Sequence, residues 1–239
     1  MSSKRCILFF VKFPEKGKVK SRLSKELDEQ IVLSLYENFV LDFLDTLKKG
    51  EYFLKVCFFP PDREEEMLHW LGETFQYMPQ SGTDLGDRMK NAFIDAFSEG
   101  FHEVLLVGSD IPDLTNEFIE AAFNLDLSAA VIGPASDGGY YLIGFKENMF
   151  LPAVFEGIHW GTETVFEETM RIFQKHNYRV HILPEWRDVD GAGDLKALYE
   201  RNKNTEFAKS RTMTYISNNL KALVDKNRPL LIPPCQGGK

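Results

Sequence analysis

The chain of 239 residues lacks three features that would assign it to common classes. Its apolar runs are far shorter than the roughly 20 residues that cross a bilayer, so we expect no membrane span. The net charge is −8, whereas a protein that neutralises nucleic-acid phosphates needs a basic face, which argues against DNA or RNA as a partner. The apolar stretch at the N-terminus is only about five residues long, too short for a signal peptide, and a cytoplasmic location is expected.

Cysteine is scarce, and several catalytic motifs are missing. The three cysteines form no CxxC motif or Cys/His cluster, so no zinc site is expected. Cys6 and Cys57 fall in apolar, strand-like segments and are expected to be buried, unreactive thiols. GxSxG is absent, which disfavours acyl transfer. The Walker loop and GxGxxG are absent too, so a bound nucleotide would need other contacts.

Patterns typical of strands and helices alternate along the chain. Apolar runs predict strands at residues 5–11, 53–59, 74–78, 103–110, 129–133, 138–145 and 178–184. Helical spacing predicts helices at residues 31–47, 62–71, 84–100, 116–124 and 162–176, with another beginning within 188–202. Asp84 is expected to cap the helix at 84–100. This alternation predicts an α/β fold with a doubly wound, mostly parallel sheet flanked by helices. Segment 138–145 interrupts the alternation and is a candidate antiparallel insertion. The 20 phenylalanines suggest a phenylalanine-rich core.

The length of the chain fits one α/β domain, and no repeat or low-complexity linker divides it. The composition changes near Asn204. Residues 209–224 could form one amphipathic helix, and 228–239, rich in proline and glycine, predict an extended tail. We therefore expect a main domain over 1–203 and a C-terminal helix and tail over 204–239.

A basic loop follows the first predicted strand, with the sequence KFPEKGKVKSRLS over 12–24. Ligands of open α/β sheets bind beyond the carboxyl ends of the strands, which is where this loop would lie. Gly17 permits a tight turn, and Lys12, Lys20 and Arg22 could reach phosphates. A solvated run of surface charge is the alternative.

Acidic residues follow two other predicted strands. Asp110, in GSDIPDL, is a candidate ligand for Mg²⁺, while Asp113 is expected to cap the next helix. In RDVDGAGDL, Asp188 and Asp190 lie one residue apart and would point to the same side of a strand end. They could share a cation with Asp110. Alternatively, Asp190 or Asp194 caps the following helix, and both descriptions can hold for different acids.

The segment GPASDGGYYLIGF, residues 133–145, contains a turn at Asp137, Gly138 and Gly139. A simple hairpin loop would explain these residues. Adjacent glycines would also let a ligand approach backbone amides, with Tyr140 as an aromatic wall.

Two further residues are candidates for ligand contacts. Arg88, in QSGTDLGDRM, could contact an anion or be an ordinary surface arginine. Trp160, in IHWGTET, could line a pocket or belong to the core.

The order of these motifs resembles a family of small bacterial and archaeal sugar transferases, some of them assigned to arsenosugar biosynthesis as glycosyltransferases. KFPEKGKVKSRL is similar to the family's opening, K-x-P-x-x-G-x-V-K-[ST]-R-L. GSDIPDL, GPASDGGYYLIG, HWGTETV and DVDGAGDL resemble its later motifs, and GPASDGGYYLIG is the most specific of them. The likeness spans about residues 5–200. Phospholactate guanylyltransferases share a similar K-x-R-L opening.

The resemblance implies the GT-A, or nucleotide-diphospho-sugar transferase, fold, which also houses nucleotidyltransferases. It implies that Lys12, Lys20 and Arg22 contact nucleotide phosphates and that Asp110 and Asp190 hold Mg²⁺ or Mn²⁺. It also implies that residues 137–140 line the sugar or acceptor pocket. The chain departs from the family in three ways: Ser21 replaces the commoner Thr, DVDGAGDL lacks a Thr-Pro pair, and GSD is not D-x-D, which leaves metal dependence open.

The expected function is transfer of a sugar from a nucleoside-diphosphate sugar to a small-molecule acceptor. A divalent cation and the basic loop would neutralise the charge of the diphosphate leaving group, and Asp137 would be the general base. One alternative is a nucleotidyltransferase that acts on a small phosphorylated substrate and releases pyrophosphate. Another is a nucleotide-binding protein without chemistry. The sequence leaves the base, sugar, acceptor and oligomeric state open.

Overall fold

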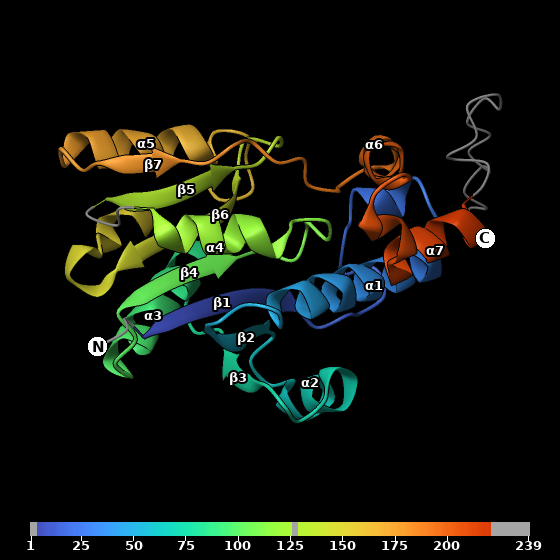
Figure 1. The fold of residues 1–239 in the computed structure, drawn as a ribbon, viewed down its shortest axis with the longest axis horizontal. Helices are drawn as coiled ribbons and strands as arrows, with labels where there is room; N and C mark the ends of the chain where they lie inside the picture. Colours follow the sequence, from blue (N-terminus) through green and yellow to red (C-terminus); the bar gives the residue numbers. More distant parts are fainter. Residues whose placement is uncertain (1–3, 126–128, 221–239) are drawn as a thin grey trace. The chain divides into compact units, whose positions relative to one another are not determined.

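The computed structural model describes residues 4–125 and 129–220, and its contacts divide the chain into two compact units (Figure 1). The sheet unit comprises Met1–Phe13 with Phe43–Asp188, and the helical unit comprises Pro14–Asp42 with Val189–Lys239. These units differ from the domains expected at 1–203 and 204–239, and that domain division stays a prediction.

The sheet unit contains a seven-stranded sheet in the order β3-β2-β1-β4-β6-β5-β7 (Figure 1). The strands are β1 Arg5–Lys12, β2 Phe53–Phe59, β3 Gln76–Pro79, β4 Glu103–Val107, β5 Ala130–Pro134, β6 Tyr140–Lys146 and β7 Val180–Ile182. Every described pairing is parallel except those of β6, which runs antiparallel to both β4 and β5. The doubly wound, mostly parallel fold is therefore confirmed, together with the antiparallel insertion.

The helices lie close to the predicted positions. They are α1 Glu29–Leu47, α2 Glu64–Leu71, α3 Leu85–Ser98, α4 Asn116–Asn124, α5 Val165–Lys175, α6 Ala192–Asn202 and α7 Arg211–Asn219. Short 3-10 turns occur at Leu23–Lys25, Glu147–Met149, Pro152–Phe155 and Glu206–Lys209. The helix expected over 209–224 is confirmed as far as Asn219; residues 221–239, with the predicted tail, lie outside the described part of the chain.

Helix capping confirms one prediction and corrects another. The carboxylate of Asp84 accepts a hydrogen bond from the amide of Asp87 (2.8 Å), so Asp84 caps α3 as expected. The prediction that Asp113 caps α4 is wrong, because Thr115 occupies the N-cap position. Asp113 is instead buried and accepts a hydrogen bond from Nε1 of Trp186 (3.1 Å).

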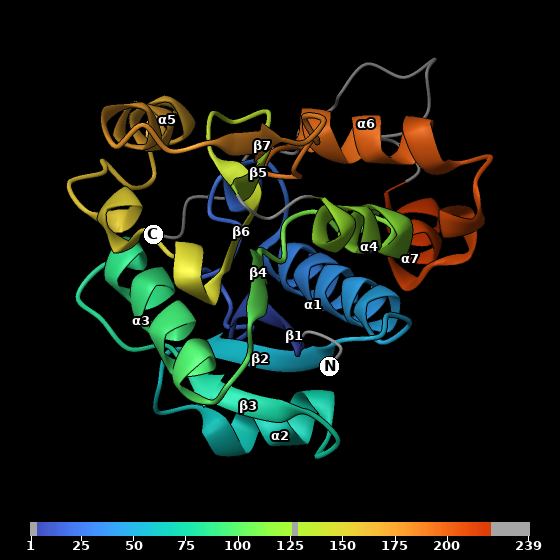
Figure 2. The same ribbon diagram turned by 60° about the vertical axis from the view of Figure 1, so that its left-hand side comes forward.

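Aromatic and aliphatic side chains fill both faces of the sheet, with α3 on one side and α4 on the other (Figure 2). On the α3 side the ring of Phe93 lies 5.3–5.8 Å from the rings of Phe145, Phe150 and Phe155. Such pairs add about 0.5–1.5 kcal/mol each beyond the burial of their area. The phenylalanine-rich core is confirmed.

Both cysteines of the sheet unit are buried free thiols, as expected. Cys6 lies in β1 and Cys57 in β2. Burial raises the pKa of Cys6 to about 12, and burial likewise raises the pKa of Cys57 well above its usual value. Because the thiolate is the reactive form, neither sulfur can act as a nucleophile at neutral pH.

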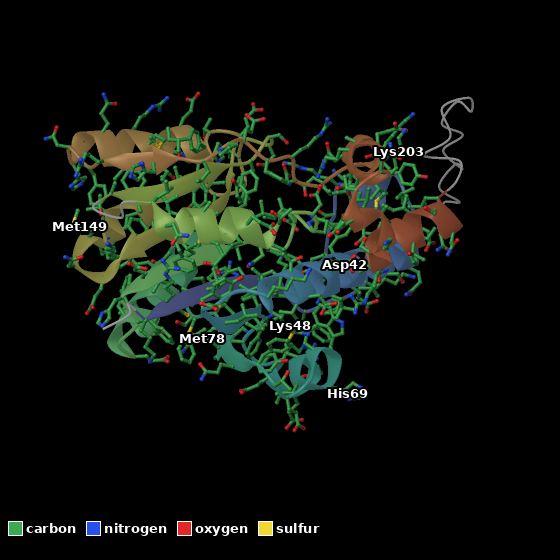
Figure 3. The ribbon with its side chains drawn as sticks, viewed as in Figure 1. Asp42, Lys48, His69, Met78, Met149 and Lys203 are labelled. Atoms are coloured by element: carbon green, nitrogen blue, oxygen red, sulfur yellow. The ribbon has the colours of Figure 1, made fainter. Side chains whose placement is uncertain are left out.

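The helical unit has a core of its own, built from α1, α6 and α7 around Leu35, Phe39 and Leu195. The buried carboxylate of Asp42, labelled in Figure 3, lies at the N-terminus of α7. It accepts hydrogen bonds from the amides of Arg211 (3.1 Å) and Thr212 (2.7 Å), two donors without partners inside the helix. Among the helices of the described residues, none is both long enough and apolar enough to cross a membrane.

Candidate functional site

The hairpin turn between β5 and β6 lies at the carboxyl edge of the sheet. Because β6 is antiparallel to β4 and β5, the turn returns to the edge at which β4 ends. Gly138 adopts a φ of +87°, which favours glycine, and the carboxylate of Asp137 accepts a hydrogen bond from the amide of Gly139 (2.9 Å). The sequence prediction of a turn is confirmed, and its position is the one where ligands of open α/β sheets bind.

A second carboxylate lies beside this turn. The backbone of Trp186 bonds to Pro134 and Ser136, and the hydroxyl of Ser136 donates to Asp188 (3.0 Å). A carboxylate oxygen of the buried Asp188 lies within 4.8 Å of one from the exposed Asp137. Like charges this close repel, and a shared divalent cation with oxygen ligands would relieve the repulsion. Sequence reasoning did not pair these two residues.

Asp110 lies in the same unit, half-buried in the turn that follows β4. The amide of Gly108 in that turn bonds to the carbonyl of Tyr141 in β6 (3.2 Å). Asp110 therefore occupies the expected edge of the sheet. Asp190 belongs to the helical unit, so a cation shared by Asp110 and Asp190 stays a prediction.

The basic loop contains residues of different character. Lys12 is exposed at the end of β1 in the sheet unit, and Gly17 has the φ of +75° that a tight turn requires. The side chain of Lys20 is only 3% exposed, and its Nζ lies 3.0 Å from Oδ1 of Asp190. Arg22 is 62% exposed, with Nη1 3.3 Å from Oδ2 of the same carboxylate. A solvated charge run therefore does not describe Lys20.

Two other acidic side chains bind the backbone amides at the start of α6. The carboxylate of Asp194 accepts hydrogen bonds from the amides of Gly191 (2.9 Å) and Asp190 (3.2 Å) at the start of α6. Glu26 accepts another from the amide of Ala192 (3.2 Å). Asp194 is thus the capping acid, whereas a cation shared by Asp188 and Asp190 stays a prediction.

The remaining candidates lie in the sheet unit as follows. The guanidinium of Arg88 lies 4.2 Å from the ring centre of Phe59, and burial lowers its pKa. Trp160 is half-buried and packs against the ring of Tyr140 at 6.4 Å. The hydroxyl of Tyr140 donates to the sulfur of Met89 (3.8 Å), and burial raises the pKa of that tyrosine. The two aromatic rings extend the core toward the turn and carry no ionised group at neutral pH.

Sequence reasoning missed one hydrogen-bonded cluster, formed by His159 and Glu168. The carboxylate of Glu168 accepts hydrogen bonds from the backbone amide of His159 (2.9 Å), from its Nδ1 (3.0 Å) and from Thr164 (3.0 Å). The amide of Phe166 in turn donates to the carbonyl of Gly138 (2.8 Å), so this loop packs on the hairpin turn. The sequence offered one signal for this cluster: Glu168 follows Thr164 by four residues at the start of a predicted helix.

The hydrogen bonds from the backbone and then the side chain of His159 lower the pKa of Glu168 from 4.5 to about 2. A carboxyl whose pKa falls on folding stabilises the protein above its unfolded pKa, and that contribution disappears as the pH falls toward the folded value. Glu168→Gln should therefore lower the melting temperature at pH 7, with a difference from wild type that shrinks between about pH 4.5 and 2. Glu167→Gln, a neighbour paired only along the helix surface with Arg171, is the control and should show no such convergence.

The mostly parallel sheet with flanking helices belongs to the fold class of the nucleotide-diphospho-sugar transferases. The chain itself belongs to the family described as "Uncharacterized protein conserved in bacteria (DUF2064)", whose model matches residues 43–162. No match was found among curated protein sequences.

Solved structures support this assignment of fold. A "putative nucleotide-diphospho-sugar transferase" from Desulfovibrio desulfuricans G20 is 44% identical, with a TM-score of 0.88 over 93% of this chain and 97% of its own. A cytidylyltransferase from Leptospira borgpetersenii is 14% identical, with a TM-score of 0.52 over 95% and 99% of the two chains. Rv0371c from Mycobacterium tuberculosis, solved as a manganese complex, is 11% identical, with a TM-score of 0.52 over 84% and 100%. The last two likenesses concern the fold alone.

Proposed function

We propose that the protein is a transferase that binds a nucleoside-diphosphate sugar and moves the sugar to a small acceptor with the help of a divalent cation. The observation that carries the proposal is the 44% identity, over nearly the whole of both chains, to the Desulfovibrio protein described as such a transferase. The polar turns at the carboxyl edge of the sheet support it, because sheets of this kind bind ligands at that edge.

The cation, Mg²⁺ or Mn²⁺, would be held by Asp137 and Asp188, with Asp110 at the same sheet edge. Their carboxylate oxygens are the ligands that such hard cations prefer, so the residues fit the ion. When bound, the cation would supply positive charge against the diphosphate leaving group. Asp137 stays the proposed general base as well. If it holds the cation, its loss should lower metal affinity. If it serves only the acceptor hydroxyl, its loss should leave metal affinity unchanged.

The substrate contacts follow from the charges and backbone of the loops. Lys12 in the sheet unit and Lys20 and Arg22 in the helical unit are the proposed phosphate contacts, with Gly17 shaping the loop that carries the last two. The sugar or acceptor would lie against Gly138, Gly139 and Tyr140, with Trp160 and Arg88 as further lining residues. Asp190, adjacent in sequence to Asp188, remains a proposed metal ligand in the loaded protein.

Product analysis tests this function directly. The protein is incubated with labelled sugar nucleotides of each common base and with nucleoside triphosphates, in the presence of Mn²⁺ or Mg²⁺. Release of a nucleoside diphosphate from a sugar nucleotide supports the sugar transferase. Thermal shift with the same ligands measures binding without turnover, because a ligand that binds the folded state raises its apparent stability.

A nucleotidyltransferase is the second candidate, favoured by the likeness of fold to the Leptospira cytidylyltransferase. In that case the basic loop would bind a triphosphate, and pyrophosphate would appear when a small phosphorylated substrate is added. Ligand-induced stabilisation with no product from either substrate class would instead indicate a nucleotide-binding protein without chemistry.

A further inference from the structure

Asp190 neutralises two cations at once within the helical unit. Its Oδ1 lies 3.0 Å from Nζ of Lys20 and its Oδ2 lies 3.3 Å from Nη1 of Arg22. The carboxylate thus offers each oxygen to a different cation, the arrangement that a phosphate group adopts between a lysine and an arginine. Both cations belong to the motif proposed to contact phosphate.

The backbone of this loop is built to hold Lys20 in place. Lys20 has a φ of +47°, a left-handed conformation that costs a non-glycine residue about 1 kcal/mol or more. Its side chain is almost fully buried, and a buried ammonium requires a negative partner. Asp190 provides that charge in the ligand-free chain.

We propose that Asp190 is the resident anion of an anion site formed by Lys20 and Arg22, and that a phosphate-bearing ligand enters this site by displacing it. The choice of phosphate rests on the function proposed above; the displacement rests on the geometry of the three side chains. The phosphate oxygens replace those of Asp190 on both cations, and the freed carboxylate turns to solvent or to a cation. Asp190 thereby sets the affinity of the site.

Displacement has a measurable cost. A ligand that binds only after the carboxylate leaves has an apparent dissociation constant equal to the intrinsic one divided by the fraction of molecules already open. Any change that weakens the hold of Asp190 on the cations must therefore tighten the binding of phosphate. If Asp190 instead only positioned Lys20 and Arg22, the same change would weaken binding.

The test is Asp190→Asn with inorganic pyrophosphate as the probe, measured by calorimetry in metal-free buffer. Asparagine keeps the shape of the side chain and an oxygen for Lys20 but removes the charge. We expect pyrophosphate to bind about tenfold more tightly than to wild type, which corresponds to about 1.4 kcal/mol. An unchanged or weaker affinity overturns the proposal.

Glu15→Gln is the matched control, because it removes one negative charge from the same loop. Glu15 pairs with the exposed Lys18 (2.8 Å), which is not one of the two cations of the site. It should change pyrophosphate affinity less than twofold, since exposed charges are screened by salt. Equal tightening in both variants would assign the effect to net charge and contradict a specific role for Asp190.

Wild-type protein gives an independent reading should Asp190→Asn fail to fold, as judged by circular dichroism. Pyrophosphate should slow hydrogen exchange in peptides covering 14–24 and accelerate it in peptides covering 189–194, because Asp190 is released. Slower exchange in both segments would show that Asp190 stays in place. If pyrophosphate binds as expected but no sugar nucleotide does, the proposed function fails and the proposal for Asp190 stands. If a sugar nucleotide binds but Asp190→Asn leaves pyrophosphate affinity unchanged, the proposal for Asp190 fails and the proposed function stands.

Discussion

Replacing Gly138 by alanine is expected to lower the free energy of unfolding by about 3–5 kcal/mol. At the φ of +87° an L-residue is strained, which costs about 1–2 kcal/mol. The added Cβ would also overlap the carbonyl oxygen of Glu163 and lie 2.6 Å from its carbonyl carbon. Those are backbone atoms of the segment that packs on the turn, so the loop must move. Urea denaturation monitored by fluorescence measures the loss.

Gly157→Ala separates the two costs. Gly157 has a φ of +68°, and nothing lies within 4 Å of a Cβ placed there. This variant should lose only the conformational contribution, about 1–2 kcal/mol. Equal losses at Gly138 and Gly157 would show that contact with the Glu163 backbone carries no weight. If Asp137 and Asp188 hold the proposed cation, movement of the turn in Gly138→Ala should also weaken Mn²⁺ binding, which electron paramagnetic resonance measures directly.

Arg22→Ala is expected to weaken binding of a nucleoside diphosphate by about 10- to 100-fold, because one charge-assisted contact to phosphate is lost. Its side chain is 62% exposed, so the melting temperature should change little. Lys20→Ala should weaken binding to a similar extent. Unlike Arg22, Lys20 is buried against Asp190, so its loss should also destabilise the helical unit.

Lys18→Ala provides the control for both variants. Lys18 lies in the same loop, is exposed and pairs with Glu15, so its removal should leave nucleotide affinity within about twofold. Wild-type affinity in both Arg22→Ala and Lys20→Ala would contradict the assignment of this loop to phosphate. A loss of affinity in Lys18→Ala as large as theirs would point to general electrostatic attraction instead of a defined site.

The sequence predicted local structure well because local structure depends on neighbours. The apolar run of β1, the bounds of α4 and the cap at Asp84 each follow from residues a few positions apart. The antiparallel direction of β6 was also predicted, since this segment interrupts the alternation of strands and helices. Asp113 was assigned wrongly to a cap because its partner, Trp186, lies 73 residues away.

The same distinction applies to the candidate site. The sequence identified the turn at Gly138 and the basic loop as separate motifs, each from its own glycines and charges. It could not show that Asp137 lies beside Asp188 or that Lys20 is buried against Asp190, since these pairs are 51 and 170 positions apart in the sequence and meet only through the sheet order and the helical core. Spacing in a sequence carries no information about such encounters until the topology is known.

The two buried thiols offer a built-in reporter of opening. Cys6 and Cys57 lie on neighbouring strands of the sheet unit, protonated and shielded from reagents. In a Cys235→Ser background, their rate of alkylation would report how often these strands part, without a denaturant or an attached dye. Comparing that rate in wild type and Gly138→Ala would show whether a clash at the hairpin turn loosens only the turn or also makes β1 and β2 separate more often.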